Sequence, residues 1–136
     1  MLLPVITSLV AGVAVAATTV GGVRSIVADL KGDYKVEFVV ESTSYTGTAK
    51  TTPGTSGAFT AKFDFTSPSP ISADATGKTT GDSLTFDMKY VDNTRNCTGT
   101  VRGRGTVAKD GNEASGGLSV DDSCGGEASG TFRLYR

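Results

Sequence analysis

The chain has 136 residues, a net charge of −1 at pH 7 and 18 glycines, and it contains neither histidine nor tryptophan. A net charge so near zero argues against a general electrostatic attraction to nucleic acid. Without histidine the chain lacks the side chain that most often serves as a general base or metal ligand, so we expect no enzyme activity and no cofactor. The length allows one domain, and the abundant glycine, serine and threonine are typical of short strands joined by tight turns.

The first expected element is the apolar segment Leu2–Val23, which precedes the first charged side chain at Arg24. As a helix rising about 1.5 Å per residue, it is long enough to cross a hydrocarbon core of about 30 Å. The alternative is a secretory signal peptide with a cleavage site at Ala14-Val15-Ala16. Because no Lys or Arg precedes the segment, we expect a retained transmembrane helix, which Arg24–Lys31 extends as far as a left-handed cap at Gly32.

Small residues recur four positions apart within this segment, as Gly12 with Ala16 and as Ala17 with Gly21. Such faces allow two helix backbones to approach closely in a membrane. We therefore expect this helix to pack on the transmembrane helices of other subunits. The domain organisation that follows is a helix with its juxtamembrane turn at 1–32 and a β domain at 33–136.

Apolar and polar residues alternate with a period of two in eight stretches of the β domain, which is the pattern of half-buried strands. The expected strands are 34–40, 44–50, 59–65, 71–75, 84–90, 97–107, 114–120 and 128–134. Turn-forming residues separate them, most clearly at Thr52–Gly57, Ser67–Pro70 and Asp110-Gly111. Eight strands joined mainly by short turns predict an up-and-down antiparallel barrel, with an open sandwich as the alternative.

The inward face of this barrel is expected to be filled by large side chains rather than hollow. The expected lining includes Phe38, Phe63, Phe86, Met88, Tyr90 and Phe132. Glycines on the same face fit tight bends or a narrow end of the barrel. These glycines are Gly99, Gly103, Gly105, Gly116 and Gly130.

The two cysteines, Cys97 and Cys124, lie almost equally far along the chain on either side of the hairpin signal at Asp110-Gly111. In an antiparallel pair they would nearly face each other, which suits the Cα separation of about 5.5 Å that a disulfide requires. The alternative is two buried thiols. A disulfide implies an oxidising compartment, so we expect the β domain on the periplasmic or extracellular side. Lys31 and Lys35 favour the cytoplasm by the positive-inside rule, but long domains translocate largely regardless of such charges.

The C-terminal half carries a family resemblance in four runs, Asn96–Val101, Asp110-Gly111, Asp122–Gly126 and Gly130–Leu134. They resemble small lipocalin-like β-barrel domains of bacterial exported proteins, which are often lipoproteins. The resemblance implies a fold and a compartment but no activity. Because no cysteine lies near residue 20, a lipid anchor cannot form there, and an anchoring protein helix is the consistent interpretation.

No group of residues predicts catalysis or a metal site. Asp64 and Asp87 fall on outward faces, and a solvated turn is a better interpretation of Asp121, Asp122 and Glu127 than a calcium site. Arg102 and Arg104 share the outer face of one strand, and Arg133 lies on the outer face of another. Together with Arg136 they are a candidate patch for lipid headgroups or an acidic partner, with ordinary solubilising charge as the alternative.

The function that these features favour is structural. We expect a non-catalytic accessory subunit of a bacterial membrane complex of the respiratory or photosynthetic type. The helix would pack among transmembrane helices in the lipid bilayer, and the barrel would brace the outer surface. Two alternatives remain, a lipocalin-like carrier of a small apolar ligand and a pilin-like filament subunit.

Overall fold

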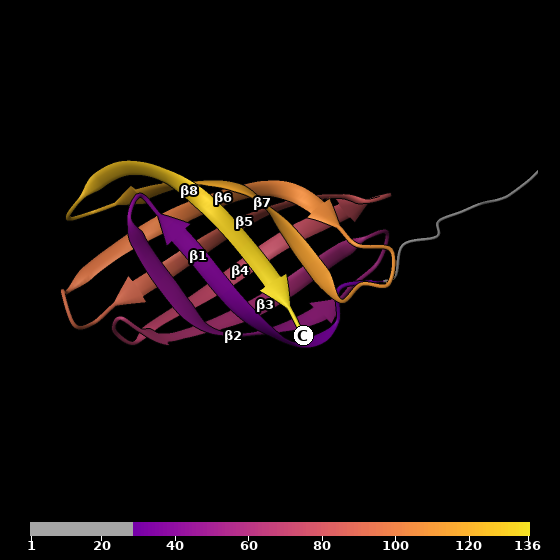
Figure 1. Cartoon of the computed structure of the whole chain (residues 1–136), viewed down its shortest axis with the longest axis horizontal. Coiled ribbons are helices and arrows are strands. Elements are labelled where there is room, and N and C mark those ends of the chain that lie inside the picture. Colours follow the sequence, from indigo (N-terminus) through magenta and orange to yellow (C-terminus); the bar gives the residue numbers. More distant parts are fainter. Residues whose placement is uncertain (1–28) are drawn as a thin grey trace, which may run out of the picture.

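The computed structural model describes residues 29–136, in which each alternating stretch forms a strand. The strands are β1 (Gly32–Val40), β2 (Thr43–Pro53), β3 (Ala58–Ser67), β4 (Ile71–Thr80), β5 (Ser83–Asp92), β6 (Cys97–Val107), β7 (Glu113–Asp122) and β8 (Gly126–Tyr135). Each pairs antiparallel with the next, and β8 returns to pair with β1, as Figure 1 shows. The predicted closed eight-stranded barrel is confirmed, and the sandwich alternative is wrong.

Phenylalanine rings fill the middle of the barrel. The ring of Phe38 lies 5.0 Å from that of Phe65 and 5.8 Å from that of Phe63, between centroids. It also lies 6.4 Å from the rings of both Phe86 and Phe132. These separations are those of edge-to-face and offset aromatic pairs. The interior was expected to be filled throughout, and these rings fill the middle of the barrel, whereas a cavity remains at one end.

Two inward glycines provide the room for two of the inward aromatic rings. A Cβ atom at Gly103 would collide with the ring of Phe86, and one at Gly99 would collide with the ring of Tyr90. Gly105 and Gly116 act differently, because a Cβ atom on either would meet the backbone of the neighbouring strand. These four glycines therefore serve two purposes, to seat aromatic rings and to let the backbones of β6 and β7 lie close together where Gly105 pairs with Gly116.

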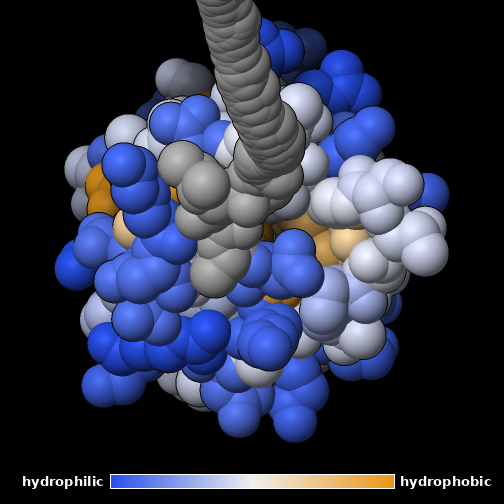
Figure 2. All heavy atoms as spheres, turned by 90° about the vertical axis from the view of Figure 1, so that its right-hand side faces the viewer, coloured by the Kyte–Doolittle hydropathy of each residue, from blue (hydrophilic) through white to orange (hydrophobic). Residues whose placement is uncertain are grey.

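One end of the barrel is closed by the residues just before β1. Leu30 is only 2 % exposed and belongs to the hydrophobic core. The guanidinium of Arg136 lies 4.1 Å from the centre of the Tyr34 ring and donates hydrogen bonds to the carbonyl oxygens of Lys31 (2.8 Å) and Asp33 (2.9 Å). The Tyr34 hydroxyl donates to the carbonyl of Gly111 (2.6 Å), in the β6–β7 turn. Figure 2 looks at this end and shows mainly hydrophilic residues around its edge, with small apolar areas between them.

These contacts correct one prediction. The expected helix does not include Asp29–Lys31, because these residues are irregular and Leu30 is drawn into the barrel. Gly32 has the predicted left-handed conformation, with φ of 87°, but it begins β1 instead of capping a helix. Among residues 29–136 there is no helix with the length and hydropathy needed to cross a bilayer.

The predicted helix-packing residues lie outside the described part of the chain, as does the rest of the apolar segment. They are Gly12, Ala16, Ala17 and Gly21. The transmembrane helix and its packing face stay predictions.

Candidate functional site

The opposite end of the barrel holds a cavity of about 220 Å³, here called the mouth cavity. Its deep part is made by buried apolar side chains, those of Phe38, Phe65, Ile71, Met88 and Val101. Nearer to solvent, the lining changes to polar residues at the strand ends and in the turns. These are Glu41, Thr43, Tyr45, Tyr90, Arg95 and Asp122. An apolar interior with a few polar groups at its opening is the usual composition of a small-molecule pocket.

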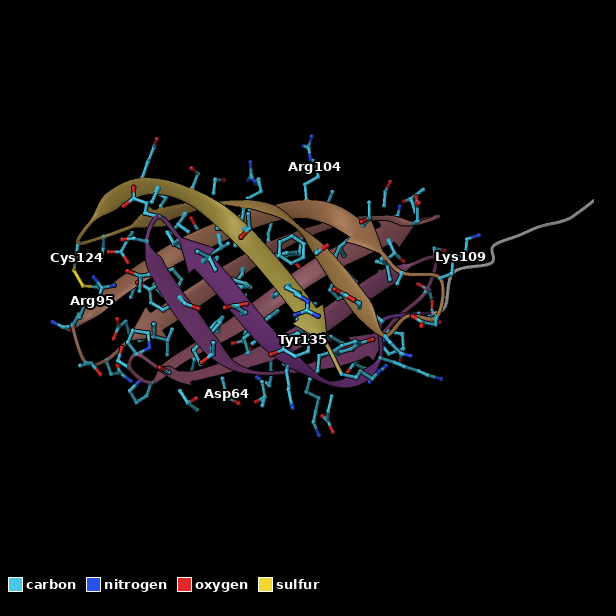
Figure 3. The ribbon with its side chains drawn as sticks, in the orientation of Figure 1. Asp64, Arg95, Arg104, Lys109, Cys124 and Tyr135 are labelled. Atoms are coloured by element: carbon cyan, nitrogen blue, oxygen red, sulfur yellow. A yellow bond between two sulfur atoms is a disulfide. The ribbon has the colours of Figure 1, made fainter. Side chains whose placement is uncertain are left out.

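A disulfide joins Cys97 to Cys124 at this end, with a Cα separation of 5.8 Å. The predicted pairing is therefore confirmed. The bond connects the first residue of β6 to the turn between β7 and β8, so it fixes two neighbouring turns of the rim to each other. Figure 3 shows Cys124 and Arg95 together at one end of the barrel and Lys109 at the other.

Asp92 organises the turn between β5 and β6 from a buried position, with an exposed fraction of 1 %. One carboxylate oxygen accepts hydrogen bonds from the backbone N–H groups of Thr94 (3.1 Å) and Arg95 (3.3 Å). The other accepts from Nε of Arg95 (2.8 Å). Burial by itself raises the pKa of Asp92, but these bonds outweigh it and hold the pKa below its ordinary value. Asp92 is therefore a charged anchor for Arg95.

Asp122 organises the turn between β7 and β8 in the same way as Asp92 organises the turn between β5 and β6. Its Oδ1 accepts from the backbone N–H groups of Cys124 (2.7 Å) and Gly125 (2.9 Å). Its Oδ2 accepts from the hydroxyl of Tyr90 and from Nη2 of Arg95 (3.2 Å). Burial opposes the charge, but these donors together lower the pKa of Asp122 to about 2. Burial, followed by the bond to Asp122, raises the pKa of Tyr90 well above its ordinary value.

Arg95 joins the two aspartates, and we call Tyr90, Asp92, Arg95 and Asp122 the mouth network. The lowered pKa of Asp122 keeps it ionised, and the raised pKa of Tyr90 keeps it protonated, over a wide pH range on both sides of neutrality. Neither is therefore suited to exchange protons with a substrate. The network is suited instead to hold the two turns in place and to present fixed polar groups to a bound molecule. The side chain of Arg95 is 48 % exposed, so it is also within reach of solvent.

The predicted arginine patch is on the outer face of the barrel, but two of its members are already paired. Arg102 lies 3.0 Å from the carboxylate of Asp87, and Arg133 lies 2.9 Å from that of Glu113. Arg104 makes no ion pair with any described residue, and it points away from the barrel in Figure 3. Arg136, the fourth residue of the patch, is used at the closed end.

The other acidic candidates are also on the outer surface or in the mouth network. Asp64 points outward, and the exposed residues Asp121 and Glu127 are direct cross-strand partners. One group within the described residues, Cys97, Asp122 and Cys124, has side-chain atoms close enough to hold a metal. Its sulfur atoms form the disulfide, so they offer no thiolate to a metal.

Sequence reasoning missed Asp92, Arg95, Glu41 and Tyr45 as residues of the site. The runs Asp92–Arg95 and Asp122–Gly125 do carry a signal, because an aspartate that opens a turn often accepts hydrogen bonds from the next backbone N–H groups. No sequence pattern indicates that Arg95 reaches across to the second of these turns.

No family model matches the chain, and no curated protein matches it. Several solved structures are similar. A redesigned β-barrel, mFAP1, bound to DFHBI is 20 % identical with a TM-score of 0.60, over 79 % of this chain and 94 % of that chain. A second redesigned barrel, b11L5F_LGL, is 21 % identical with a TM-score of 0.61, over 83 % of this chain and 98 % of that chain. EF1p2_mFAP2b bound to DFHBI is 16 % identical with a TM-score of 0.62, over 79 % and 93 %. At these identities the likeness shows the fold alone.

Proposed function

We propose that the barrel is a non-catalytic binding domain that takes a small, mainly apolar ligand into the mouth cavity. The observation that carries this proposal is the difference between the two ends of the barrel. Leu30 and the contacts of Arg136 close one end, whereas the other keeps a cavity of about 220 Å³ that opens to solvent. A cup of this kind buries the apolar part of a ligand and leaves its polar part at the rim.

The size and the lining of the mouth cavity support a binding function over a purely structural role for the barrel. Phenylalanine rings fill the centre, but the inward side chains at the mouth include the smaller Val120 and Ala128. The cavity, at about 220 Å³, is smaller than a typical drug-sized site, so the ligand is a small molecule, with one or two fused rings or a short chain, that enters in part. Two of the similar designed barrels are described as bound to DFHBI, which supports the capacity of this architecture to hold a small molecule.

The proposal is tested with a substitution that fills the cavity, and the readout is the loss of ligand binding. Ala128 lines the cavity, so Ala128→Phe would occupy it, whereas Ser129→Phe adds the same ring to the next residue, whose side chain is exposed. Equilibrium dialysis of the full chain in lipid nanodiscs against 2-naphthylmethanol should give saturable binding that Ala128→Phe removes and Ser129→Phe keeps. Equal binding by all three proteins would reject the proposal.

We propose in addition that the chain works as a membrane-anchored accessory subunit of a larger bacterial complex, with the barrel outside the cytoplasm. Two observations favour it, the disulfide and the start of β1 at Gly32, which eight residues separate from the apolar segment. The double change Gly12→Leu with Ala16→Leu keeps the segment apolar but obstructs close helix packing. It should leave the protein in the membrane and remove it from the purified complex. Unchanged co-purification would contradict this role, and failure of a fibre to assemble would indicate the filament alternative.

A further inference from the structure

The mouth cavity carries an excess of negative charge. Its lining includes the acidic residues Asp122 and Glu41, of which Glu41 is exposed, and the carboxylate of Asp92 lies 2.8 Å from Nε of Arg95. Arg95 is the one cationic residue among the described residues that line the cavity. We infer that the ligand of this cavity is a cation, an organic amine or quaternary ammonium on an apolar body. This inference rests on the proposed function, since it specifies the ligand of the same cavity.

The positive charge of Arg95 would by itself favour an anionic ligand, but the contacts of Arg95 argue against one. Its Nε lies 2.8 Å from Asp92 and its Nη2 lies 3.2 Å from Asp122, so two carboxylates already balance its charge. A ligand carboxylate at Arg95 would lie beside these two acids, and their negative charges would repel it. Because the carboxylates of Asp92 and Asp122 are 1 % and 10 % exposed, drawing Arg95 away from either would leave a buried charge without its partner, which is costly. An anion therefore gains little here.

Glu41 supplies a carboxylate that is not balanced in this way. It lies in the turn between β1 and β2, lines the cavity, and makes no ion pair with any residue of the described range. Its backbone N–H donates to the carbonyl of Ser129 (3.3 Å), which fixes the turn against β8. Asp121 and Glu127, paired across β7 and β8 on the outer side of the same end, add to the negative potential. A cation that enters the cavity is attracted by all of these groups.

The aromatic residues of the cavity suit the same kind of ligand. Phe38, Phe65, Tyr45 and Tyr90 all contribute to the lining. The face of an aromatic ring attracts a cation that lies within about 6 Å of its centre, and tyrosine does so more strongly than an aliphatic side chain. The mouth cavity therefore combines an apolar interior, aromatic rings and an unbalanced carboxylate, which together favour an amine over a neutral or anionic molecule of the same shape.

The test compares three probes that share a ring system and differ in charge: 2-naphthylmethylamine, 2-naphthylmethanol and 2-naphthoate. Equilibrium dialysis uses the full chain in phosphatidylcholine nanodiscs, and the Ala128→Phe protein in the same nanodiscs supplies the background. We expect the amine to bind more tightly than the alcohol by about two- to fivefold, the range of one partly exposed ion pair. The naphthoate should bind most weakly.

Two variants locate the charge that is responsible. Glu41→Gln should remove most of the preference for the amine over the alcohol. Asp82→Asn, in the exposed turn between β4 and β5 at the closed end, makes the same change in net charge and should keep the preference. Equal affinities for the three probes, or a preference that survives Glu41→Gln, would overturn the inference and leave the binding function intact. Binding of none of the probes above the Ala128→Phe background would overturn both.

Discussion

At the scale of single residues, Asp122 connects the most parts of the mouth. Its two carboxylate oxygens receive hydrogen bonds from two backbone N–H groups of its own turn, from Tyr90 on β5 and from Arg95 in a different turn. A carboxylate with this many donors is stabilised in its charged form, which is why its pKa falls to about 2. The charge of one side chain thus holds two turns together.

The lowered pKa of Asp122 predicts how stability depends on pH. A group whose pKa is lower in the folded than in the unfolded state adds stability above its unfolded value of 3.8 and loses it as the pH falls toward about 2. Denaturant unfolding of the full chain should therefore show falling stability between about pH 4 and pH 2. Asp122→Asn should lower the free energy of unfolding at pH 7 by about 1 kcal/mol and make this decline shallower. An unchanged decline in the variant would show that other carboxyl groups cause it.

At the scale of elements, alternation of residue type was sufficient to predict all eight strands and their order. The errors lie at strand ends. β4 was expected to stop before Gly77 but runs to Thr80, because a glycine that seats the ring of Phe59 continues the strand instead of ending it.

The mouth cavity could not be predicted in this way, because it depends on how far side chains from several strands extend into a shared space. The disulfide could be predicted, because register alone places Cys97 opposite Cys124.

Gly103, which lies against the ring of Phe86, gives a prediction about the packing of side chains inside the barrel. Gly103→Ala should destabilise the protein by about 1–3 kcal/mol, because its Cβ atom would displace the buried ring of Phe86. Gly117→Ala is the matched control on the neighbouring strand β7. Its Cβ atom would have only one neighbour, at 3.9 Å, so the change should be neutral or slightly stabilising. Similar losses in both variants, measured by urea unfolding, would contradict the role given to Gly103.

The disulfide gives a prediction for the two rim turns. Replacing both Cys97 and Cys124 by alanine should lower stability by about 3–4 kcal/mol, on the chain-entropy estimate for a loop of this length. Because the bond fixes the rim, the variant should also bind 2-naphthylmethylamine more weakly at a temperature where it is still folded. Unchanged affinity in the folded variant would show that the turns keep their positions without the bond.

At the scale of the whole molecule, the two ends of the barrel differ in structure and, we propose, in function. The residues before β1 and the C-terminal Arg136 meet at the closed end. If the apolar segment is the anchor that we propose, this end faces the bilayer and the mouth cavity faces away from it. A ligand would then enter from the aqueous side.

Leu30 tests how the closed end contributes to stability. Leu30→Ala should cost about 2–5 kcal/mol, because it removes a buried side chain from the core. Lys31→Ala is the control, since the side chain of Lys31 is exposed and its contacts at this end are made by backbone atoms. Thermal unfolding of both variants measures the difference. Equal midpoints would contradict the structural role of Leu30.

The proposed ligand site is at the disulfide-bearing end and not elsewhere on the barrel. The most direct test of this location is a titration of the ¹⁵N-labelled full chain with 2-naphthylmethylamine, followed by amide chemical shifts. We predict shifts for Tyr45, Tyr90, Gly125 and Ala128, which line the cavity, and none for Gly111 and Asn112 at the closed end. Shifts confined to the closed end or to the outward-facing residues of the strands, or no shifts at all, would contradict the claim.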